Sequence, residues 1–233
     1  QIPTRMAYLI SIGSTVCGTT AIMATAPVIR ANKSEISYAI ANITLFGILS
    51  MLLYPYFANF YFEGNSLFAG LFLGTAIHET SQVAAAGLIY DQQFNSPETL
   101  NVATVTKLLR NTFLIVMIPL FAFLYNRGKI KEKSYSVLNI FPYFVLGFVG
   151  MIILRNTGDE FFSTNNNWIE IIGLIKDSSK IFLTMAMAAI GLSTNLKDIK
   201  NMGYKPFIVG FIAMLTVGIV SILTIEIYLK LII

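Results

Sequence analysis

The segment GTAIHETSQVAAAG, residues 74–87, lies inside a long apolar run from Leu67 to Tyr90. It contains the only histidine of the chain, His78, with a carboxylate beside it at Glu79. Its other polar side chains are Thr75, Thr80, Ser81 and Gln82. Ionisable groups at membrane depth are costly and usually face a polar interior or a water-filled cavity. The segment therefore predicts a functional centre inside a membrane protein.

The composition supports this interpretation. Hydrophobic residues make up 55% of the 233 residues and charged residues only 12%, against about 25% charged in soluble domains. Several apolar runs approach the ~20 residues that cross a bilayer as a helix. These features predict an all-α, polytopic helical membrane protein with the lipid bilayer as its solvent. Because its net charge of +4 is spread over short connections, it indicates topology rather than a nucleic-acid partner.

Hydropathy and turn residues divide the chain into apolar segments. We expect membrane segments at about 7–29, 36–60, 67–90, 100–125, 137–154, 181–196 and 207–233. We expect residues 155–167 to form a polar connection and residues 168–180 to form an interfacial amphipathic helix. The first segment is interrupted by Gly13, Gly18 and Pro27. This interruption predicts a discontinuous or re-entrant helix, with a kinked continuous helix as the alternative.

Residues 7–62 and 67–125 resemble each other weakly, which predicts an inverted repeat, although chance similarity between membrane helices is an alternative. Both flanks of segment 7–29 carry Lys or Arg, whereas both flanks of segment 67–90 carry none. By the positive-inside rule, this pattern predicts that the two segments are hairpins that enter the membrane from opposite faces. We expect residues 1–233 to form a single transmembrane domain that lacks N-terminal helices of a longer chain.

The polar residues of these segments suggest an anion site. A re-entrant tip exposes backbone N–H groups that attract anions, and Thr19, Thr20, Thr80 and Ser81 add hydroxyl groups. Lys107 and Arg110 are three residues apart, so they share one helical face and provide charge complements for an anion. Alternatively, these two side chains snorkel to the interface or pair with Glu79.

His78 and Glu79 are candidate coupling groups, because such residues form proton relays in transporters. Residues 78–82, HETSQ, resemble the zinc pattern H-E-x-x-H, but Gln82 replaces the second histidine. With a single histidine and a single cysteine, the sequence predicts no metal site, no cofactor and no enzymatic activity. The coupling ion is expected to be H⁺ or Na⁺.

Three motifs in order carry a resemblance to a known family: residues 13–29, residues 76–87, and residues 186–196 with the sequence AMAAIGLSTNL. They resemble the YeiH-type family of bacterial inner-membrane proteins, which carries a sulfate-exporter name. The resemblance implies additional N-terminal helices, a multi-pass location in the inner (plasma) membrane, and kinship with cation/proton antiporters and anion transporters. It also implies discontinuous helices in inverted repeats.

The sequence therefore predicts a secondary transporter that exports a small anion, such as sulfate or an organic sulfonate, with ion coupling. The expected substrate-binding residues are Thr19, Thr20, Thr80, Ser81, Gln82, Ser193, Thr194 and Asn195. The alternatives are a passive anion channel, a non-transporting membrane receptor and an intramembrane hydrolase, the last disfavoured by the single histidine. The sequence leaves open the substrate, the direction of transport and whether the protein is a homo-oligomer.

Overall fold

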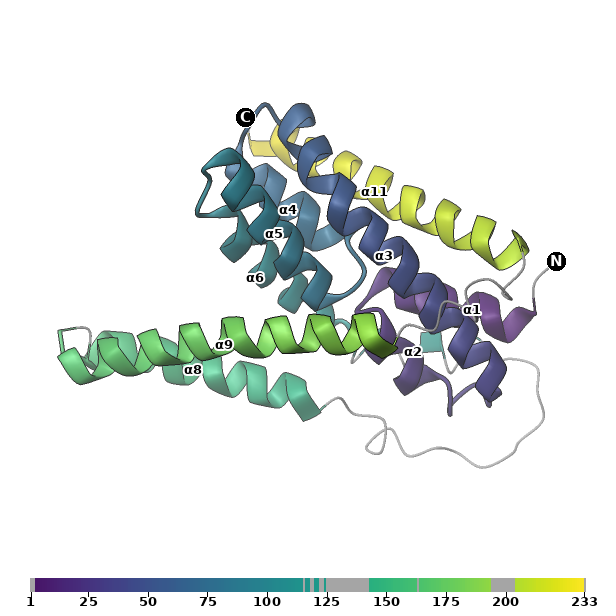
Figure 1. Cartoon of the computed structure of the whole chain (residues 1–233), viewed down its shortest axis with the longest axis horizontal. Coiled ribbons are helices and arrows are strands. Elements are labelled where there is room, and N and C mark those ends of the chain that lie inside the picture. The colour runs from purple at the N-terminus through teal and green to yellow at the C-terminus, as the bar shows by residue number, and fades with distance from the viewer. Residues whose placement is uncertain are drawn as a thin grey trace. The chain divides into compact units, whose positions relative to one another are not determined.

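Figure 1 shows the computed structural model of the chain. It describes residues 3–114, 116, 117, 120, 121, 124, 143–162, 164–193 and 204–232. Every regular element within these residues is an α-helix, which confirms the predicted fold class. The described residues form two compact units, one drawn from residues 1–140 and 194–233 and the other from residues 141–193.

Two long helices frame the first unit. Helix α3, Lys33–Tyr61, starts at a capping box in which Asn32 and Glu35 satisfy each other's backbone N–H groups. Helix α11, Tyr204–Ile232, packs along α3: Tyr54 Oη donates to the Met214 carbonyl at 3.1 Å. Within the described residues, these are the two helices long and apolar enough to cross a membrane.

A first pair of short helices lies beside the N-terminal half of α3. Helix α1, Thr4–Thr15, and helix α2, Thr19–Thr25, are separated by residues 16–18. Their buried apolar side chains form one cluster with Ala39 and Ile43 of α3. The pair folds back on itself at the break, since Gly13 near the end of α1 faces Ile22 in α2.

A second pair lies beside the C-terminal half of α3 (Figure 1). Helix α4, Ser66–Ala76, and helix α5, Thr80–Phe94, are separated by residues 77–79. The outer ends of both helices lie against the end of α3, where Phe68 contacts Phe62 and Phe94 contacts Tyr56. Helices α4 and α5 therefore run antiparallel, with the break at the inner tip of a hairpin.

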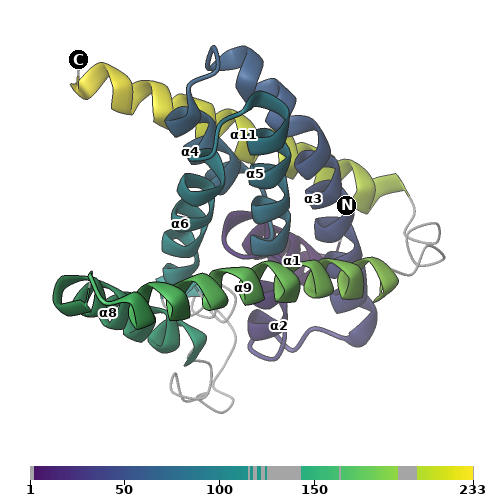
Figure 2. The same cartoon turned by 60° about the vertical axis from the view of Figure 1, so that its left-hand side comes forward.

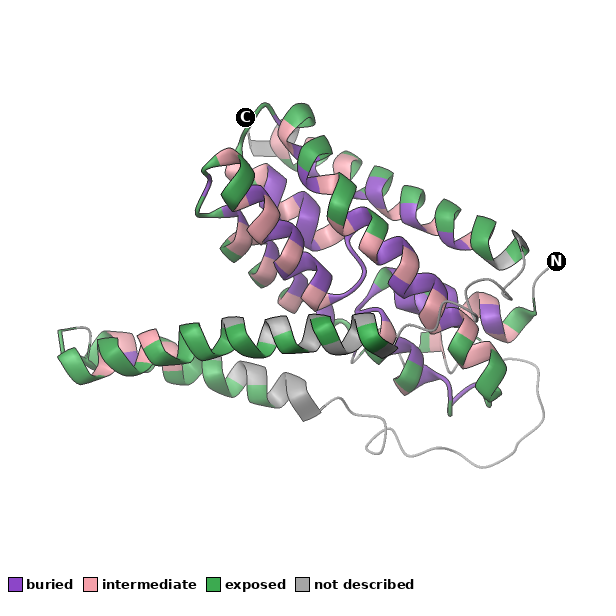
Figure 3. Ribbon diagram, viewed as in Figure 1, coloured by how far each residue is buried: buried purple, intermediate pink, exposed green. Residues whose placement is uncertain are grey.

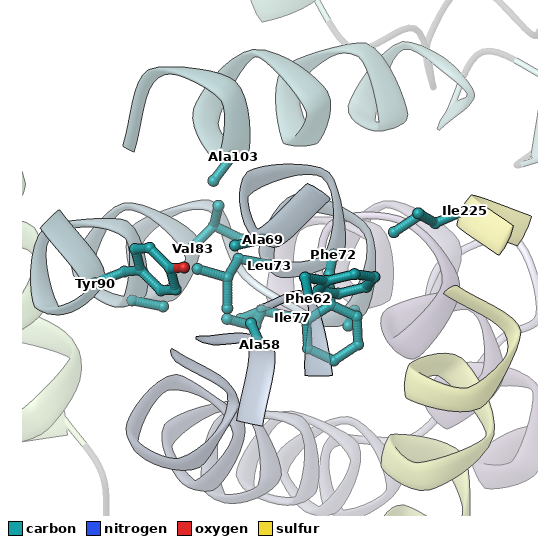
Figure 4. Packing of buried hydrophobic residues seen from close by; sticks show 12 residues of the cluster. Ala58, Phe62, Ala69, Phe72, Leu73, Ile77, Val83, Tyr90, Ala103 and Ile225 are labelled. Atoms are coloured by element: carbon teal, nitrogen blue, oxygen red, sulfur yellow. The ribbon is translucent and has the colours of Figure 1, made fainter. Parts of the chain in front are cut away.

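The second pair contributes most of the side chains of the largest apolar cluster in the described residues (Figure 4). Phe62 and Phe72 pack ring to ring on one side of the cluster, and Tyr90 closes the other side. Leu73 and Ile77 lie between them in the close-up view. This cluster buries the inner faces of α3, α4, α5, α6 and α11 together.

Helix α6, Thr99–Thr112, runs parallel to α4 and antiparallel to α5. The approach to α4 is close: a Cβ atom added at Gly74 would lie 2.6 Å from the Ala103 carbonyl oxygen. Beyond the tip of the second pair, Leu114 packs with Ile12 and Val16 of the first pair. Helix α6 thus packs against the second pair, and Leu114, which follows it in the chain, packs against the first pair. Helix α3 also contacts both pairs.

The second unit consists of helices α8, Tyr143–Phe162, and α9, Asn166–Ser193, and two predicted boundaries here were wrong. The predicted connection at 155–167 is mostly helical, because Arg155 pairs with Asp159 one turn later and Trp168 Nε1 donates to Asp159. Residues 168–180 and 181–193 form one continuous helix, since charged side chains on the surface of a helix do not break its backbone hydrogen bonds. Much of α8 and α9 is exposed (Figure 3).

Candidate functional site

The two helix breaks meet beside the middle of α3. The side chain of Gln82, in the first turn of α5, donates to the Thr44 carbonyl of α3 at 3.3 Å. A Cβ atom on Gly13, just before the first break, would lie 3.1 Å from Ile43. Figure 2 shows α1 and α2 next to the inner ends of α5 and α6. Two segments about 60 residues apart in the chain thus form one site.

Glu79 links the two breaks directly. Its Oε1 accepts a hydrogen bond from the Thr19 backbone N–H at 3.2 Å and another from the Thr19 hydroxyl group. Gly18 has a φ of +66°, and a Cβ atom there would lie 3.1 Å from Glu79 Oε1. The break in the first pair therefore needs glycine for both its backbone conformation and the approach of the carboxylate.

Lys107 of α6 lies between the two breaks and is fully buried. Its Nζ donates to the carbonyl oxygens of Val16 and Ile77, each at 2.9 Å, and of His78 at 2.5 Å. Val16 follows the last residue of α1, and Ile77 follows the last residue of α4. All three N–H groups of the ammonium thus bind main-chain oxygens from both hairpins.

Arg110 makes the same kind of connection one turn further along α6. Its guanidinium donates to the carbonyls of Thr15 at 2.8 Å and Ser14 at 2.5 Å in the first pair. It also donates to the carbonyls of Thr75 at 2.5 Å and Ile77 at 3.2 Å in the second pair. In the described part of the chain, neither Arg110 nor Lys107 forms an ion pair with Glu79.

The charges at the site follow the helix dipoles. The exposed carbonyls at a helix C-terminus carry partial negative charge, and the N–H groups at a helix N-terminus carry partial positive charge. Lys107 and Arg110 lie at the C-terminal ends of α1 and α4, whereas Glu79 is the N-cap residue of α5 and binds the first residue of α2. Each charged side chain therefore provides a partner for backbone N–H or C=O groups at a helix break. Lipid has no hydrogen-bonding groups that could replace this partner in the hydrocarbon core.

Several buried polar atoms at the site make no hydrogen bond within the described structure: His78 Nδ1 and Nε2, Glu79 Oε2 and Asn111 Oδ1. Asn111 is connected to the second break, because its Nδ2 donates to the Thr80 hydroxyl at 3.1 Å. Buried polar groups are rarely left without a partner. Of these atoms, the Glu79 carboxylate oxygen can accept a proton or bind a small cation, and the Asn111 amide oxygen can accept a hydrogen bond or bind a small cation.

The structure brings together most of the predicted site residues. Thr19 and Thr20 start α2, and Thr80, Ser81 and Gln82 start α5, beside His78, Glu79, Lys107 and Arg110. Ser193 is the last residue of α9, in the second unit, and its side chain lies outside the description. Thr194 and Asn195 also lie outside the described residues.

Asn111 was not among the residues predicted for the site. Its spacing of four residues from Lys107 places both on one face of α6, so this residue could have been found from the sequence. The carbonyl oxygens that hold Lys107 and Arg110 could not have been found in that way, because backbone atoms carry no sequence signal.

Comparison with known proteins identifies the family. The model of the family described as Conserved hypothetical protein 698 matches residues 1–210. The chain belongs to this family. Similar proteins include UPF0324 membrane proteins of Fusobacterium nucleatum, 38% identical over 231 residues, and Streptococcus agalactiae, 38% identical over 221 residues. A UPF0324 membrane protein of Clostridium tetani is 33% identical over 233 residues.

These relatives establish that the chain is a membrane protein, and they support the resemblance to the YeiH-type family. The matches cover 94–95% of this chain and 64–66% of each relative, so the chain spans slightly less than two thirds of their length. No solved structure matches the chain. The activity of this member of the Conserved hypothetical protein 698 family therefore has to be inferred from the site.

Proposed function

We propose that the chain forms the core of a secondary transporter that moves a small anion across the bacterial plasma membrane, coupled to H⁺ or Na⁺. One observation carries the proposal: two helical hairpins bring their breaks together at buried, charged residues beside a membrane-length helix. Unwound backbone inside a membrane is tolerated where protein buries it or where it lines a cavity. In transporters, such discontinuous helices form the binding site near the middle of the bilayer.

The geometry of α3 supports hairpins that enter from opposite faces. Its 29 residues span about 43 Å at 1.5 Å per residue, which is long enough to cross the hydrocarbon core. The first pair lies beside its N-terminal half and the second pair beside its C-terminal half. We therefore propose that both pairs are re-entrant and that residues 7–62 and 67–125 are inverted repeats.

The proposed substrate is a small anion, for two reasons. The site contains two cationic side chains, the buried Lys107 and the half-buried Arg110, and one carboxylate, Glu79, so its local charge attracts anions. Hydroxyl groups of Thr80 and Ser81 lie at the start of α5, where they can donate hydrogen bonds. Sulfate and organic sulfonates fit this chemistry and the resemblance.

Coupling is assigned to the Glu79 carboxylate, with His78 beside it. Glu79 uses Oε1 to hold Thr19, while its Oε2 is buried and makes no hydrogen bond in the described structure. This free oxygen can receive a proton or bind a small cation without any loss of the existing contacts. The same residue therefore joins the two hairpins and carries the coupling ion.

Flux measurements in proteoliposomes test the proposal. A thermal-shift screen of inorganic and organic anions on the purified chain first identifies an anion that stabilises it. We then expect this anion to accumulate above its outside concentration when a pH or Na⁺ gradient is imposed. Flux that only equilibrates the anion would indicate a passive channel instead, and stabilisation without any flux would indicate a receptor.

A further inference from the structure

The ammonium group of Lys107 lies in an environment that resembles a metal-ion site. Three main-chain carbonyl oxygens, from Val16, Ile77 and His78, surround Nζ at 2.5–2.9 Å. They come from two separate helix breaks, and the side chain is fully buried. Carbonyl oxygens are typical ligands of hard cations, and unwound carbonyls and half-helix C-termini coordinate Na⁺ or H⁺ in broken-helix transporters.

The other charged groups nearby do not neutralise this ammonium by direct contact. Glu79, from the second break, directs Oε1 to Thr19, and Arg110 occupies a separate set of carbonyls. Cys17, in the first break, and His78 complete the titratable groups around Lys107. The carbonyl oxygens are therefore the direct partners that offset the cost of burying the positive charge.

We propose that Lys107 is a tethered cation: its ammonium fills a carbonyl-lined site for a monovalent cation between the two helix breaks. The protein then needs no Na⁺ or K⁺ at this position, because the side chain supplies the charge that joins the hairpins. If the proposed transport function holds, the consequence is that H⁺, carried on Glu79, is the coupling ion. The site itself does not depend on transport.

Replacement of Lys107 by alanine leaves three buried carbonyl oxygens around a space that previously held an ammonium group. A free ammonium ion has the same charge and the same donors, so it can occupy that space. Na⁺ or K⁺ can also enter, because carbonyl oxygens coordinate these ions directly, but ammonium matches the native group most closely in both charge and hydrogen-bond donors. Lys107→Leu is the matched control, since its larger apolar side chain fills the space and repels a cation.

The test is thermal unfolding of the purified chain in detergent, at one ionic strength and one pH, in choline, sodium, potassium or ammonium chloride. The wild type should have the same Tm in all four salts. Lys107→Ala should lose about 10 °C in choline chloride, because three buried carbonyl oxygens lose their donor, and ammonium chloride should restore at least half of this loss. Lys107→Leu should show no recovery in any salt.

Equal Tm values of Lys107→Ala in choline and ammonium chloride would overturn the proposal, as would equal recovery of Lys107→Leu. If Lys107→Ala unfolds during purification, the yield of folded protein extracted with ammonium chloride or with choline chloride replaces the Tm, with the same expected difference. A specific rise of the wild-type Tm in sodium or potassium chloride would also contradict the proposal. None of these measurements requires transport, so they are independent of the proposed function.

Discussion

Glu79→Gln should remove the pH dependence of anion transport while the protein stays folded. The glutamine keeps an amide oxygen that can accept the hydrogen bonds from Thr19, so the link between the two breaks persists. It cannot take up or release a proton, however, and it carries no negative charge. In proteoliposomes, we expect the ratio of initial rates at two pH values to differ from unity for the wild type and to fall to about one for Glu79→Gln.

Two variants serve as controls for this experiment. Glu98→Gln removes an exposed carboxylate at the start of α6 and should leave the ratio of rates unchanged. His78→Gln should change the ratio of rates less than Glu79→Gln does if His78 only orients the Glu79 side chain. A Glu79→Gln protein that transports with the wild-type pH profile would show that Glu79 has a structural role alone.

Arg110→Leu should destabilise the protein by about 3 kcal/mol. The guanidinium binds four carbonyl oxygens at the ends of α1 and α4, and leucine leaves these oxygens, three of which are part-buried, without this donor. The cost of unsatisfied buried polar groups adds to the loss of charge at two helix C-termini. Chemical or thermal unfolding in detergent gives the magnitude.

Arg155→Leu is the matched control for this prediction. Arg155 also forms hydrogen bonds and an ion pair, with Asp159, but both side chains are more than 40% exposed. Exposed pairs contribute little, so this variant should change the stability by less than about 1 kcal/mol. Similar losses for the two variants would mean that the carbonyl contacts of Arg110 are not what stabilises the hairpins.

The sequence predicted the parts of the fold that depend on local chemistry. Gly18 and the polar residues around His78 predicted the two helix breaks, and long apolar runs predicted α3 and α11. It failed where side-chain contacts decide the local structure. The Arg155–Asp159 pair and the Trp168 hydrogen bond extend the helices of the second unit into a stretch that composition alone marks as a loop.

The sequence predicted most of the residues that form the candidate site, but it did not predict which atoms their side chains bind. Lys107 and Arg110 were expected on one face of a helix, and they lie there. Their partners are main-chain oxygens from segments about 30 and 90 residues away, which no side-chain pattern encodes. A pair between Glu79 and these cations was one alternative, yet the direct partner of Glu79 is Thr19 in the other hairpin.

The central claim is that two hairpins enter the membrane from opposite faces and meet at their breaks, and cysteine labelling tests it most directly. In a Cys17→Ala background, Asn65→Cys and Gln92→Cys place thiols at the exposed outer ends of α4 and α5. Ser34→Cys places one at the exposed start of α3, beside the first hairpin. With an impermeant maleimide, the first two should label from the periplasmic side and the third from the cytoplasmic side. Labelling of Asn65→Cys and Gln92→Cys from opposite sides would contradict the claim.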